Sequence, residues 1–512
     1  MQPVSPERQE TVKALSWQLL YGNYRPKLGD QGWNDLAAKC NPPEFRSMDG
    51  DVDVPMEPFN QALLFIDQRL GSGDGTYVEE VARLSVERWG SMFRNLVKQL
   101  AGRPNKMLEI FAREVHPYFL ADAKASALEE TRDGFARIRM DNSLVETFKV
   151  GLLRGFVEIT GSEAKIQKLS DGSYGVQWTL KTDAPTPSAW ALFVNAVRLP
   201  FLTATLVPVL VGAAIAAFDF RQGTVAGEFD WLLFAFTLVG VAFFHLGTNT
   251  ANDYFDHRSG ADEANFTPTP FSGGSRVIQR GLMDAKTMGR YAATFYTIGI
   301  LIGLSLVYLI WQRSGNLQTA LNILWLGIAG FLLGVLYTAP PARLSHRGIG
   351  ELSVAVGFGP LIVMGAYFVQ VQAFSTTALL ASLPIGFLIA AVLYINEFPD
   401  KDGDARVGKR TLIVRLPDRA AVVGYHILIT LAYLSILAGV ILKDPNSGKA
   451  FFPIYTLAAL LTFPLAFMAM RILNKNYRFP YRLIPANAFT ILIHLATGVL
   501  FFAGYIAAIF LG

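Results

Sequence analysis

Two short stretches of the chain gather carboxylates and carboxamides at the ends of long apolar runs. The first covers residues 249–262 and contains Asn249, Asn252, Asp253, Asp256 and Asp262. Asn252 and Asp256 are four residues apart, so on a helix they share one face. Ionisable side chains at membrane depth are costly and normally face a bundle interior or an aqueous cavity. The stretch therefore indicates a binding or catalytic site at the end of a membrane helix.

The second stretch, residues 396–404, repeats the first after an offset of 144 residues. Its Asn396 and Asp400 reproduce the Asn-x-x-x-Asp spacing, and Asp404 would share a helical face with Asp400. One such cluster is as well explained by solvated helix ends, where Asn, Asp and Gly are ordinary residues. Two clusters of matched spacing favour a duplicated unit whose halves face each other.

The composition of both stretches predicts a Mg²⁺ site. Hard oxygen ligands, with no Cys or His at ligand spacing, favour Mg²⁺ over zinc. Mg²⁺ is commonly held by few carboxylates and shared with substrate phosphates. The predicted metal ligands, direct or through water, are Asn252, Asp253, Asp256, Asp262, Asp400 and Asp404. Of these, the predicted catalytic residues are Asp256, Asp400 and Asp404.

These stretches also carry a resemblance to a known family. The pattern Asn-Asp-Tyr-x-Asp-x-x-x-Gly-x-Asp begins at residue 252, and Asp-x-x-x-Asp-x-x-x-Gly-Lys-x-Thr-Leu-x-x-Arg-Leu begins at residue 400. Together they resemble the UbiA superfamily of membrane prenyltransferases, and most of all its MenA-type branch, which prenylates 1,4-dihydroxy-2-naphthoate for menaquinone. The resemblance covers about residues 188–512. It implies a bundle of nine transmembrane helices that transfers a polyprenyl group from its diphosphate to an aromatic acceptor.

The resemblance also implies the groups that bind the diphosphate. Lys409 follows the second stretch in Gly-Lys-Arg-Thr-Leu, and Tyr337 opens a Tyr-x-x-x-Pro connection like that of the family. Arg198 is similar to the arginine that begins the family's first helix. The full predicted substrate-binding set is Lys409, Tyr337, Arg198, Arg276, Arg280, Arg343, Arg347, Asn249 and Asn396. Except for Lys409, each basic residue taken singly is more simply explained as a positive anchor at the inner membrane surface.

The chain departs from the MenA-type pattern at two places. The family motif reads Asn-Asn-x-Arg-Asp where this chain has Asn396-Glu397-Phe398-Pro399-Asp400, and Pro399 should break the helix there. Phe-Ser-Gly-Gly-Ser-Arg at residues 271–276 replaces a Gly-Pro-x-Arg type segment. The acceptor therefore stays open between 1,4-dihydroxy-2-naphthoate, a related quinone precursor and another hydroxylated aromatic.

Composition separates the chain into two parts. Of 512 residues, 52% are hydrophobic and 17% are charged, but the first 185 residues have the pattern of a soluble domain and residues 186–512 that of a membrane domain. No secretory signal begins the chain, so we expect the first part to stay in the cytoplasm. The single cysteine, Cys40, excludes an intrachain disulfide and fits a reducing compartment. A formal charge of +4 without Lys/Arg runs does not indicate nucleic-acid binding.

Residues 1–185 are predicted to form a soluble α+β domain. Apolar periodicity predicts helices over 77–100 and 143–160, and the segments 164–169 and 174–180 predict a β-hairpin. The Gly-Leu-Leu-Arg-Gly-Phe segment, Gly151–Phe156, resembles haem/nitric-oxide-binding and vinyl-4-reductase type sensor domains, which implies a small-molecule ligand. His116, beside a proline, is better explained as a structural histidine than as a haem ligand. Residues 182–188 are predicted to be a linker.

Nine apolar runs of near-spanning length follow. They cover about residues 197–218, 230–251, 290–311, 321–338, 350–372, 378–397, 421–442, 452–473 and 486–510. With the first domain in the cytoplasm, the inner connections hold 15 Lys and Arg and the outer connections hold four. This positive-inside pattern predicts a multi-pass protein of a bacterial inner membrane, with both acidic stretches on the cytoplasmic face.

Two other functions fit parts of the sequence. Duplicated membrane units with polar residues also occur in transporters, but here the acids lie at helix ends on one face and not at the bilayer centre. Alternatively, the membrane part is a degenerate anchor and the first domain is a working sensor. The second acidic pair and the Gly-Lys-x-Thr-Leu segment are intact, which argues against this alternative. The sequence therefore favours the prenyltransferase.

Overall fold

The computed structural model describes two compact units. One comprises Met1–Phe193 with Arg280–Leu282, and the other Val194–Gln279 with Met283–Gly512. The described residues are 10–46, 48, 52–92, 94–116, 120, 126–181, 188–265, 269–445 and 447–511. The predicted linker lies, except for Ser188, outside the described residues.

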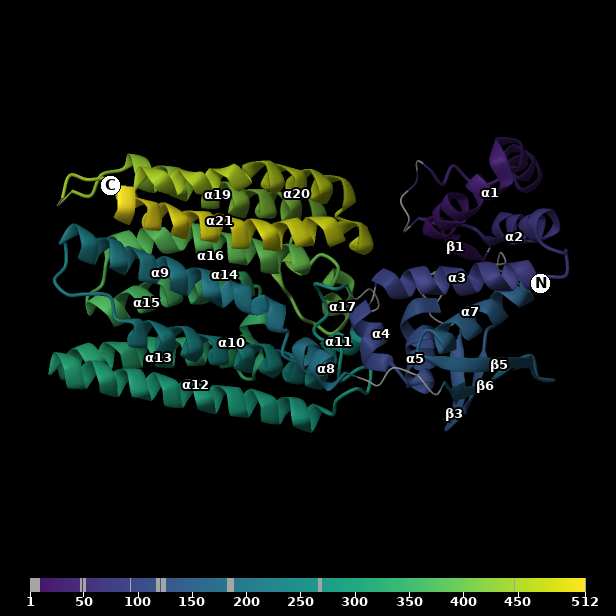
Figure 1. Cartoon of the computed structure of the whole chain (residues 1–512), viewed down its shortest axis with the longest axis horizontal. Helices are drawn as coiled ribbons and strands as arrows, with labels where there is room; N and C mark the ends of the chain where they lie inside the picture. Colours follow the sequence, from purple (N-terminus) through teal and green to yellow (C-terminus); the bar gives the residue numbers. More distant parts are fainter. Residues whose placement is uncertain are drawn as a thin grey trace, which may run out of the picture. The chain divides into compact units, whose positions relative to one another are not determined.

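The first unit is an α+β fold with two small antiparallel sheets (Figure 1). A four-stranded sheet has the order β3-β4-β6-β5, and β1 pairs with β2. The strands are β1 Thr11–Lys13, β2 Asp53–Pro55, β3 Ala127–Arg132, β4 Phe135–Arg139, β5 Ser162–Lys168 and β6 Tyr174–Leu180. The hairpin expected from the sequence is the pair β5 and β6, in which Ile166 lies opposite Val176.

The helices of the first unit pack beside these sheets. They are α1 Ala14–Cys40, α2 Met56–Leu70, α3 Thr76–Met92, α4 Arg94–Leu100, α5 Pro104–Ile110 and α7 Glu146–Glu158. Helix is found on both sides of residue 93, as α3 and α4, over the stretch 77–100 where a helix is expected; residue 93 lies outside the described residues. On α7, a Cβ atom at Gly151 would lie 2.2 Å from the carbonyl oxygen of Glu79, and one at Gly155 would lie 2.9 Å from Cβ of Val86. The glycines of the sensor-like segment thus permit close packing of α7 on α3.

His116 is a neutral histidine in the core of the first unit. It is 2% exposed, its ring centre lies 5.0 Å from that of Phe111, and neither ring nitrogen has a hydrogen-bond partner. Burial, with a further contribution from Lys149, lowers its pKa to about 3. An unfolded histidine titrates near 6.5. The unfolded chain therefore takes up a proton below about pH 6.5 that the folded unit refuses, so stability falls as the pH drops towards 3.

This histidine gives a testable pH dependence. At pH 5 the free energy of unfolding of the unit should be about 2 kcal/mol lower than at pH 7 because of His116 alone. His116→Leu should remove that part of the loss. Hydrogen exchange at the amides of α7, in the full chain in detergent at both pH values, measures it. An equal loss of protection in the native chain and the variant would contradict the assignment.

The second unit is a bundle of long helices that lie side by side (Figure 1). Within the described residues, nine helices are long and apolar enough to cross a membrane, as expected from the sequence. They are Leu199–Gln222, Trp231–Ser259, Ala285–Ser314, Leu317–Thr338, Gly350–Val371, Thr376–Asn396, Asp418–Ile441, Ile454–Asn476 and Ile484–Leu511. Their main elements are α9 Thr203–Gln222, α10 Trp231–Ser259, α12 Ala285–Ser314, α13 Leu317–Thr338, α14 Gly350–Val356, α15 Ile362–Val371, α16 Thr376–Asn396, α19 Asp418–Ile441, α20 Phe463–Asn476 and α21 Ile484–Leu511.

Helix α16 occupies the interior of this bundle. It contacts α9, α14, α19 and α21. In its most apolar 18-residue segment 72% of the residues are buried, against 11% in that of α13. Short helices continue from the ends of two spans: α11 Ala261–Ala264 follows α10, and α17 Lys401–Arg406 follows α16. Since α11 and α17 are in contact, the bundle brings both acidic stretches to one end.

Candidate active site

The first acidic stretch lies on the last turns of α10. Asn252 Nδ2 donates to Asp256 Oδ2 over 2.8 Å, which confirms that the two side chains share a helical face. Asp253 Oδ2 accepts from the backbone N–H of Ser275 at 3.1 Å. The Oδ1 atoms of Asp253 and Asp256 are buried without a hydrogen-bond partner. Buried carboxylate oxygens without donors are costly, so this end of α10 is built to receive a cation or a donor.

The second stretch lies where α16 ends. The helix stops at Asn396, as Pro399 predicts, and the chain continues through Asp400 into α17. Asp404 N donates to Asp400 O at 2.8 Å, so the two acids are one helical turn apart. Asp400 Oδ1 accepts from Asn265 Nδ2 at 2.7 Å, and its Oδ2 accepts from Gly273 N at 3.1 Å. The connection after α10 therefore holds a carboxylate of the second stretch.

Lys409 joins the two stretches. Its Nζ lies 3.8 Å from Asp256 Oδ2 and 3.4 Å from Asp404 Oδ1. Its backbone N–H donates to Asp404 O at 2.9 Å, which fixes the start of the side chain. Burial alone would lower the pKa of Lys409, but Asp256, Asp404 and Asp400 outweigh it and raise the pKa well above its usual value. Lys409 therefore stays charged between acids from both halves of the bundle.

Several buried carboxyl groups lie close together at this end of the bundle. Burial raises the pKa of Asp404 to about 6, with Lys409 opposing and Asp400 and Asp256 adding to the shift. Burial also raises the pKa of Asp400, against Lys409. The pKa of Asp262 lies well above its usual value because of burial and of the charges of Asp256 and Asp253. A second cation would relieve this repulsion.

The residues present fit a hard divalent cation in their chemistry and charge. The ligand atoms are carboxylate and carboxamide oxygens, and two buried oxygens lack donors. Among the residues that the structure describes, no three His, Cys, Asp or Glu side chains come close enough to form a closed metal site by themselves. Mg²⁺ in proteins usually keeps several waters and shares substrate phosphates.

Three groups at the site were not predicted. His346 Nε2 lies 3.6 Å from Asp256 Oδ1, and its carbonyl accepts from Arg410 N at 3.0 Å, so His346 ties the first stretch to the Lys409 loop. Asn265 and the backbone of Gly273 bind Asp400, as described above. His346 lies in the same connection as Arg343 and Arg347, but no spacing rule relates it to Asp256. Asn265 and Gly273 lie in the connection after α10, and the sequence does not specify the path of this loop.

The predicted arginines lie in different surroundings, and one of them lies directly beside the acids. Arg198 lies 4.0 Å from Asp253 Oδ1, beside the site. Arg276 is buried and donates through Nη1 to the carbonyls of Asp262 and Asn265, so it holds the loop together. Arg343 and Arg347 are exposed, and Arg347 donates to the carbonyl of Pro341. The remaining one, Arg280, belongs to the first unit.

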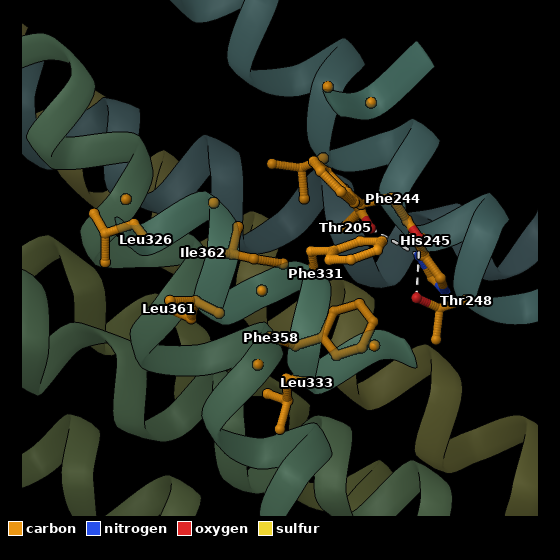
Figure 2. A pocket seen from close by; sticks show the side chains of 18 of the residues that line it. Thr205, Phe244, His245, Thr248, Leu326, Phe331, Leu333, Phe358, Leu361 and Ile362 are labelled. Atoms are coloured by element: carbon orange, nitrogen blue, oxygen red, sulfur yellow. Dashed lines mark hydrogen bonds between the residues drawn. The ribbon is translucent and has the colours of Figure 1, made fainter. Parts of the chain in front are cut away.

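A cavity of about 510 Å³ opens beside the acids and extends along the bundle. Its walls come from α9, α10, α12, α13, α14, α15 and α16 and from the turn Gly357–Leu361 between α14 and α15, and they are mostly apolar. Figure 2 shows Phe331, Phe358, Leu361 and Ile362 around it. His245 also lines it and is hydrogen-bonded through Nδ1 to Thr205 Oγ1 at 2.7 Å. The polar residues at the acidic end are Arg198, Asn249, Asn252, Tyr337 and Asn396. The cavity therefore suits a molecule with an apolar tail and a charged head.

The glycine loop before Arg276 leaves little room beside the acids. Gly274 has φ +69°, and a Cβ there would lie 3.1 Å from Asp253 Oδ1 and 3.3 Å from both carboxylate oxygens of Asp262. We expect Gly274→Ala to lower activity about tenfold, because backbone strain of about 1 kcal/mol is added to displacement of two carboxylates.

Gly260→Ala is the matched control for this prediction. Gly260 has φ +78°, but a Cβ there meets nothing within 4 Å, so this variant carries the strain without the crowding. Initial rates and melting temperatures of both variants separate the effects. Equal losses of activity would show that crowding of the carboxylates is unimportant.

Comparison with known proteins identifies the family. A sequence profile of the UbiA prenyltransferase family matches residues 205–491, more than half of the chain. The chain belongs to the UbiA prenyltransferase family. Among members of this family, 1,4-dihydroxy-2-naphthoate octaprenyltransferase of Haemophilus influenzae is 31% identical over 238 residues, 46% of this chain and 73% of that protein. The 2-carboxy-1,4-naphthoquinone phytyltransferase of Synechocystis is 26% identical over 319 residues, 62% of this chain and 94% of that protein.

A solved structure is similar at lower identity. It is that of a UbiA homologue from Archaeoglobus fulgidus bound to GPP and Mg²⁺, which aligns with 60% of this chain and 99% of its own, with 13% identity and a TM-score of 0.40.

Membership of the UbiA family confirms several predictions. The protein is a prenyltransferase, and with its nine apolar helices in the described chain it is a multi-pass integral membrane protein. The expected UbiA-like bundle, preceded by a region of helices and small sheets, is confirmed. The transporter and the degenerate anchor are not supported.

Proposed function

We propose that the protein transfers a polyprenyl group from its diphosphate to an aromatic quinone precursor, 1,4-dihydroxy-2-naphthoate, and that the reaction depends on Mg²⁺. The observation that carries this proposal is the meeting of carboxylates from α10 and α17 around Lys409, beside Asn252, which lines the apolar cavity. A charged diphosphate head and an isoprenoid tail need these two environments side by side.

In this proposal Asn252, Asp256, Asp400 and Asp404 hold the Mg²⁺, with Asp253 and Asp262 in support. The bound ion would neutralise charge on the departing diphosphate. Lys409 and Arg198 place further positive charge where the diphosphate binds, and electrostatic stabilisation of this kind is commonly the largest contribution to catalysis. His346 and Asn252 hold the carboxylate of Asp256 in position through their contacts with its two oxygens.

The apolar wall has a separate role in this proposal. Ionisation of the allylic C–O bond leaves a carbocation that water would capture, so the residues around the reacting carbon must exclude water. Phe244, Phe331 and Phe358 line the cavity and offer faces with negative electrostatic potential towards a cation. The isoprenoid tail would extend along them, away from the acids.

The acceptor is proposed from the names of relatives and from its chemistry. Two relatives named as 1,4-dihydroxy-2-naphthoate octaprenyltransferases are 31% and 30% identical to this chain, over 238 and 250 residues. With this acceptor the new C–C bond forms at the ring carbon that bears the carboxylate, and CO₂ leaves. The reaction then needs no nucleophilic side chain. A related hydroxylated aromatic is the alternative, since Glu397 and Pro399 depart from the MenA-type pattern.

Two further parts of the proposal are the orientation of the protein in the membrane and the role of the first unit. The charge asymmetry of the connections favours a cytoplasmic site. The first unit is proposed as a small-molecule sensor, and deletion of residues 1–185 with unchanged kinetics and regulation would contradict this.

The test of the proposed function uses membranes that contain the full chain. They are supplied with an all-trans polyprenyl diphosphate, Mg²⁺ and either 1,4-dihydroxy-2-naphthoate or a mixture of quinone precursors, and products are identified by mass spectrometry. A prenylated, decarboxylated naphthalene product that disappears with a chelator is the expected result. Another prenylated aromatic would replace the acceptor, and no prenylated product from any acceptor would overturn the proposal.

A further inference from the structure

Two equivalent asparagines, Asn252 and Asn396, line the cavity next to the acids. Each lies four residues before an acid of its motif, Asp256 or Asp400. The asparagines line the cavity whereas these two acids do not, so the asparagines separate the acids from the apolar wall. In the proposed reaction this is the level at which the allylic carbon leaves the diphosphate and meets the acceptor. The orientation of each carboxamide therefore decides what the reacting groups meet there.

Asn252 directs its NH₂ group towards Asp256. Its Nδ2 donates to Asp256 Oδ2 at 2.8 Å, and a carboxylate can only accept. The carboxamide end that remains is Oδ1, a hydrogen-bond acceptor. Asn252 thus offers the cavity an oxygen.

The carboxamide of Asn396 is bound through its oxygen, by Asn487 on α21. Asn487 Nδ2 lies 2.6 Å from Asn396 Oδ1 and 3.3 Å from the carbonyl oxygen of Ile395. Because a carbonyl can only accept, this contact fixes the NH₂ end of Asn487, and Asn396 must turn its oxygen towards it. Asn487 is 1% exposed and does not line the cavity. The carboxamide end of Asn396 that remains for the cavity is its NH₂ group.

We propose that the NH₂ group of Asn396 donates a hydrogen bond to an oxygen of the aromatic acceptor, and that Asn487 is a positioning residue that holds Asn396 in this orientation. This inference rests on the proposed prenyl transfer. It requires an acceptor with an oxygen lone pair, from a ring hydroxyl or a carboxylate, beside the carbon that is prenylated. The diphosphate is left to Lys409, Arg198 and the acids.

Asn396→Asp tests the donor directly, since it keeps the shape and replaces NH₂ by oxygen. The KM for 1,4-dihydroxy-2-naphthoate should rise at least about tenfold, because a hydrogen bond is lost and two acceptors are opposed. The KM for all-trans-geranylgeranyl diphosphate should stay within about threefold of the native value. An unchanged KM for the naphthoate, or an equal rise in both KM values, would overturn the proposal.

Asn487→Leu tests the positioning role, and Thr490→Val is its matched control. Thr490 lies on the same helix, is fully buried, and shares a 2.7 Å hydrogen bond with Tyr425 outside the cavity wall. Both variants lose a buried bond between helices, so both should melt at a lower temperature. Only Asn487→Leu should raise the KM for the naphthoate, by about threefold to tenfold. Equal KM values in the two variants would reduce Asn487 to a packing residue and overturn its role.

Two inhibitors distinguish the oxygens that Asn396 can bind. 2-Naphthoate carries only the carboxylate, and 1,4-dihydroxynaphthalene carries only the hydroxyl groups. Weaker competitive inhibition of Asn396→Asp by one of them identifies the oxygen, and unchanged inhibition by both overturns the contact. An inactive native protein would instead defeat the proposed function, whereas an active native protein with an unaffected Asn396→Asp variant would defeat only this inference.

Discussion

Asp256→Asn is expected to reduce prenyl transfer at least about a thousandfold. The substitution keeps the size of the side chain but removes a charge that lies 3.8 Å from Lys409 Nζ and 3.6 Å from His346 Nε2. It also replaces one of the oxygens proposed to hold Mg²⁺. The Mg²⁺ concentration that gives half-maximal activity should rise as well. Initial rates over a range of Mg²⁺ concentrations, with the product measured by chromatography, give both quantities.

Asp219→Asn is the matched control for this loss. Asp219 is a partly buried carboxylate on α9, and its Oδ2 accepts from Tyr367 Oη at 2.7 Å. It does not line the cavity, so its replacement should change stability and leave the Mg²⁺ response as it was. If Asp256→Asn keeps more than a tenth of the native rate, or if the control loses as much activity, the proposed metal site is wrong.

The membrane fold could be predicted from the sequence because its rules are local. A span needs about 20 apolar residues, and the bilayer requires its backbone to be hydrogen-bonded internally, so runs such as 230–251 can only be helices. The ends of the spans are predicted less accurately. The second span continues to Ser259, since the acidic stretch is part of α10. Polar residues that face other protein groups do not end a membrane helix, and hydropathy does not distinguish them from a loop.

The acids of the site could be predicted, but their partners could not. Spacing places Asn252 and Asp256 on one face, and the hydrogen bond between them confirms it. Asn487 lies 91 residues from Asn396, in a mostly apolar helix with a few scattered polar residues. Contacts of this kind depend on which helices are neighbours and on how each is rotated. Those are properties of the assembled bundle, and no local pattern contains them.

The two acidic stretches have equivalent spacing but different surroundings. Both end on helical turns with the same spacing, yet Asp400 is held by Asn265 and Gly273, while Asp256 faces Lys409 and His346. Pro399 ends α16 before its acids, whereas α10 continues through its own. A repeated motif therefore predicts where the carboxylates lie but not which groups surround them.

Lys409→Met is expected to separate binding of the diphosphate from binding of the metal. The side chain lies between Asp256 and Asp404, and methionine fills a similar volume without the charge. Loss of this cation should raise the KM for the polyprenyl diphosphate and lower kcat/KM by about a hundredfold to a thousandfold. The carboxylates then lose a competing positive charge, so the Mg²⁺ concentration for half-maximal activity should not rise. This is the opposite of the response expected for Asp256→Asn.

Lys401→Met provides the matched control, and Lys409→Arg tests the charge. Lys401 lies in the same connection, but its Nζ pairs with Asp418 at 2.6 Å, and an ion pair of this partly exposed kind contributes at most about 1 kcal/mol. Its replacement should leave both constants near the native values. Lys409→Arg keeps the charge and should recover part of the loss, although the larger guanidinium has to fit a buried position. A Lys409→Met protein that needs more Mg²⁺ but binds the diphosphate normally would show that the lysine serves the metal ligands and not the substrate.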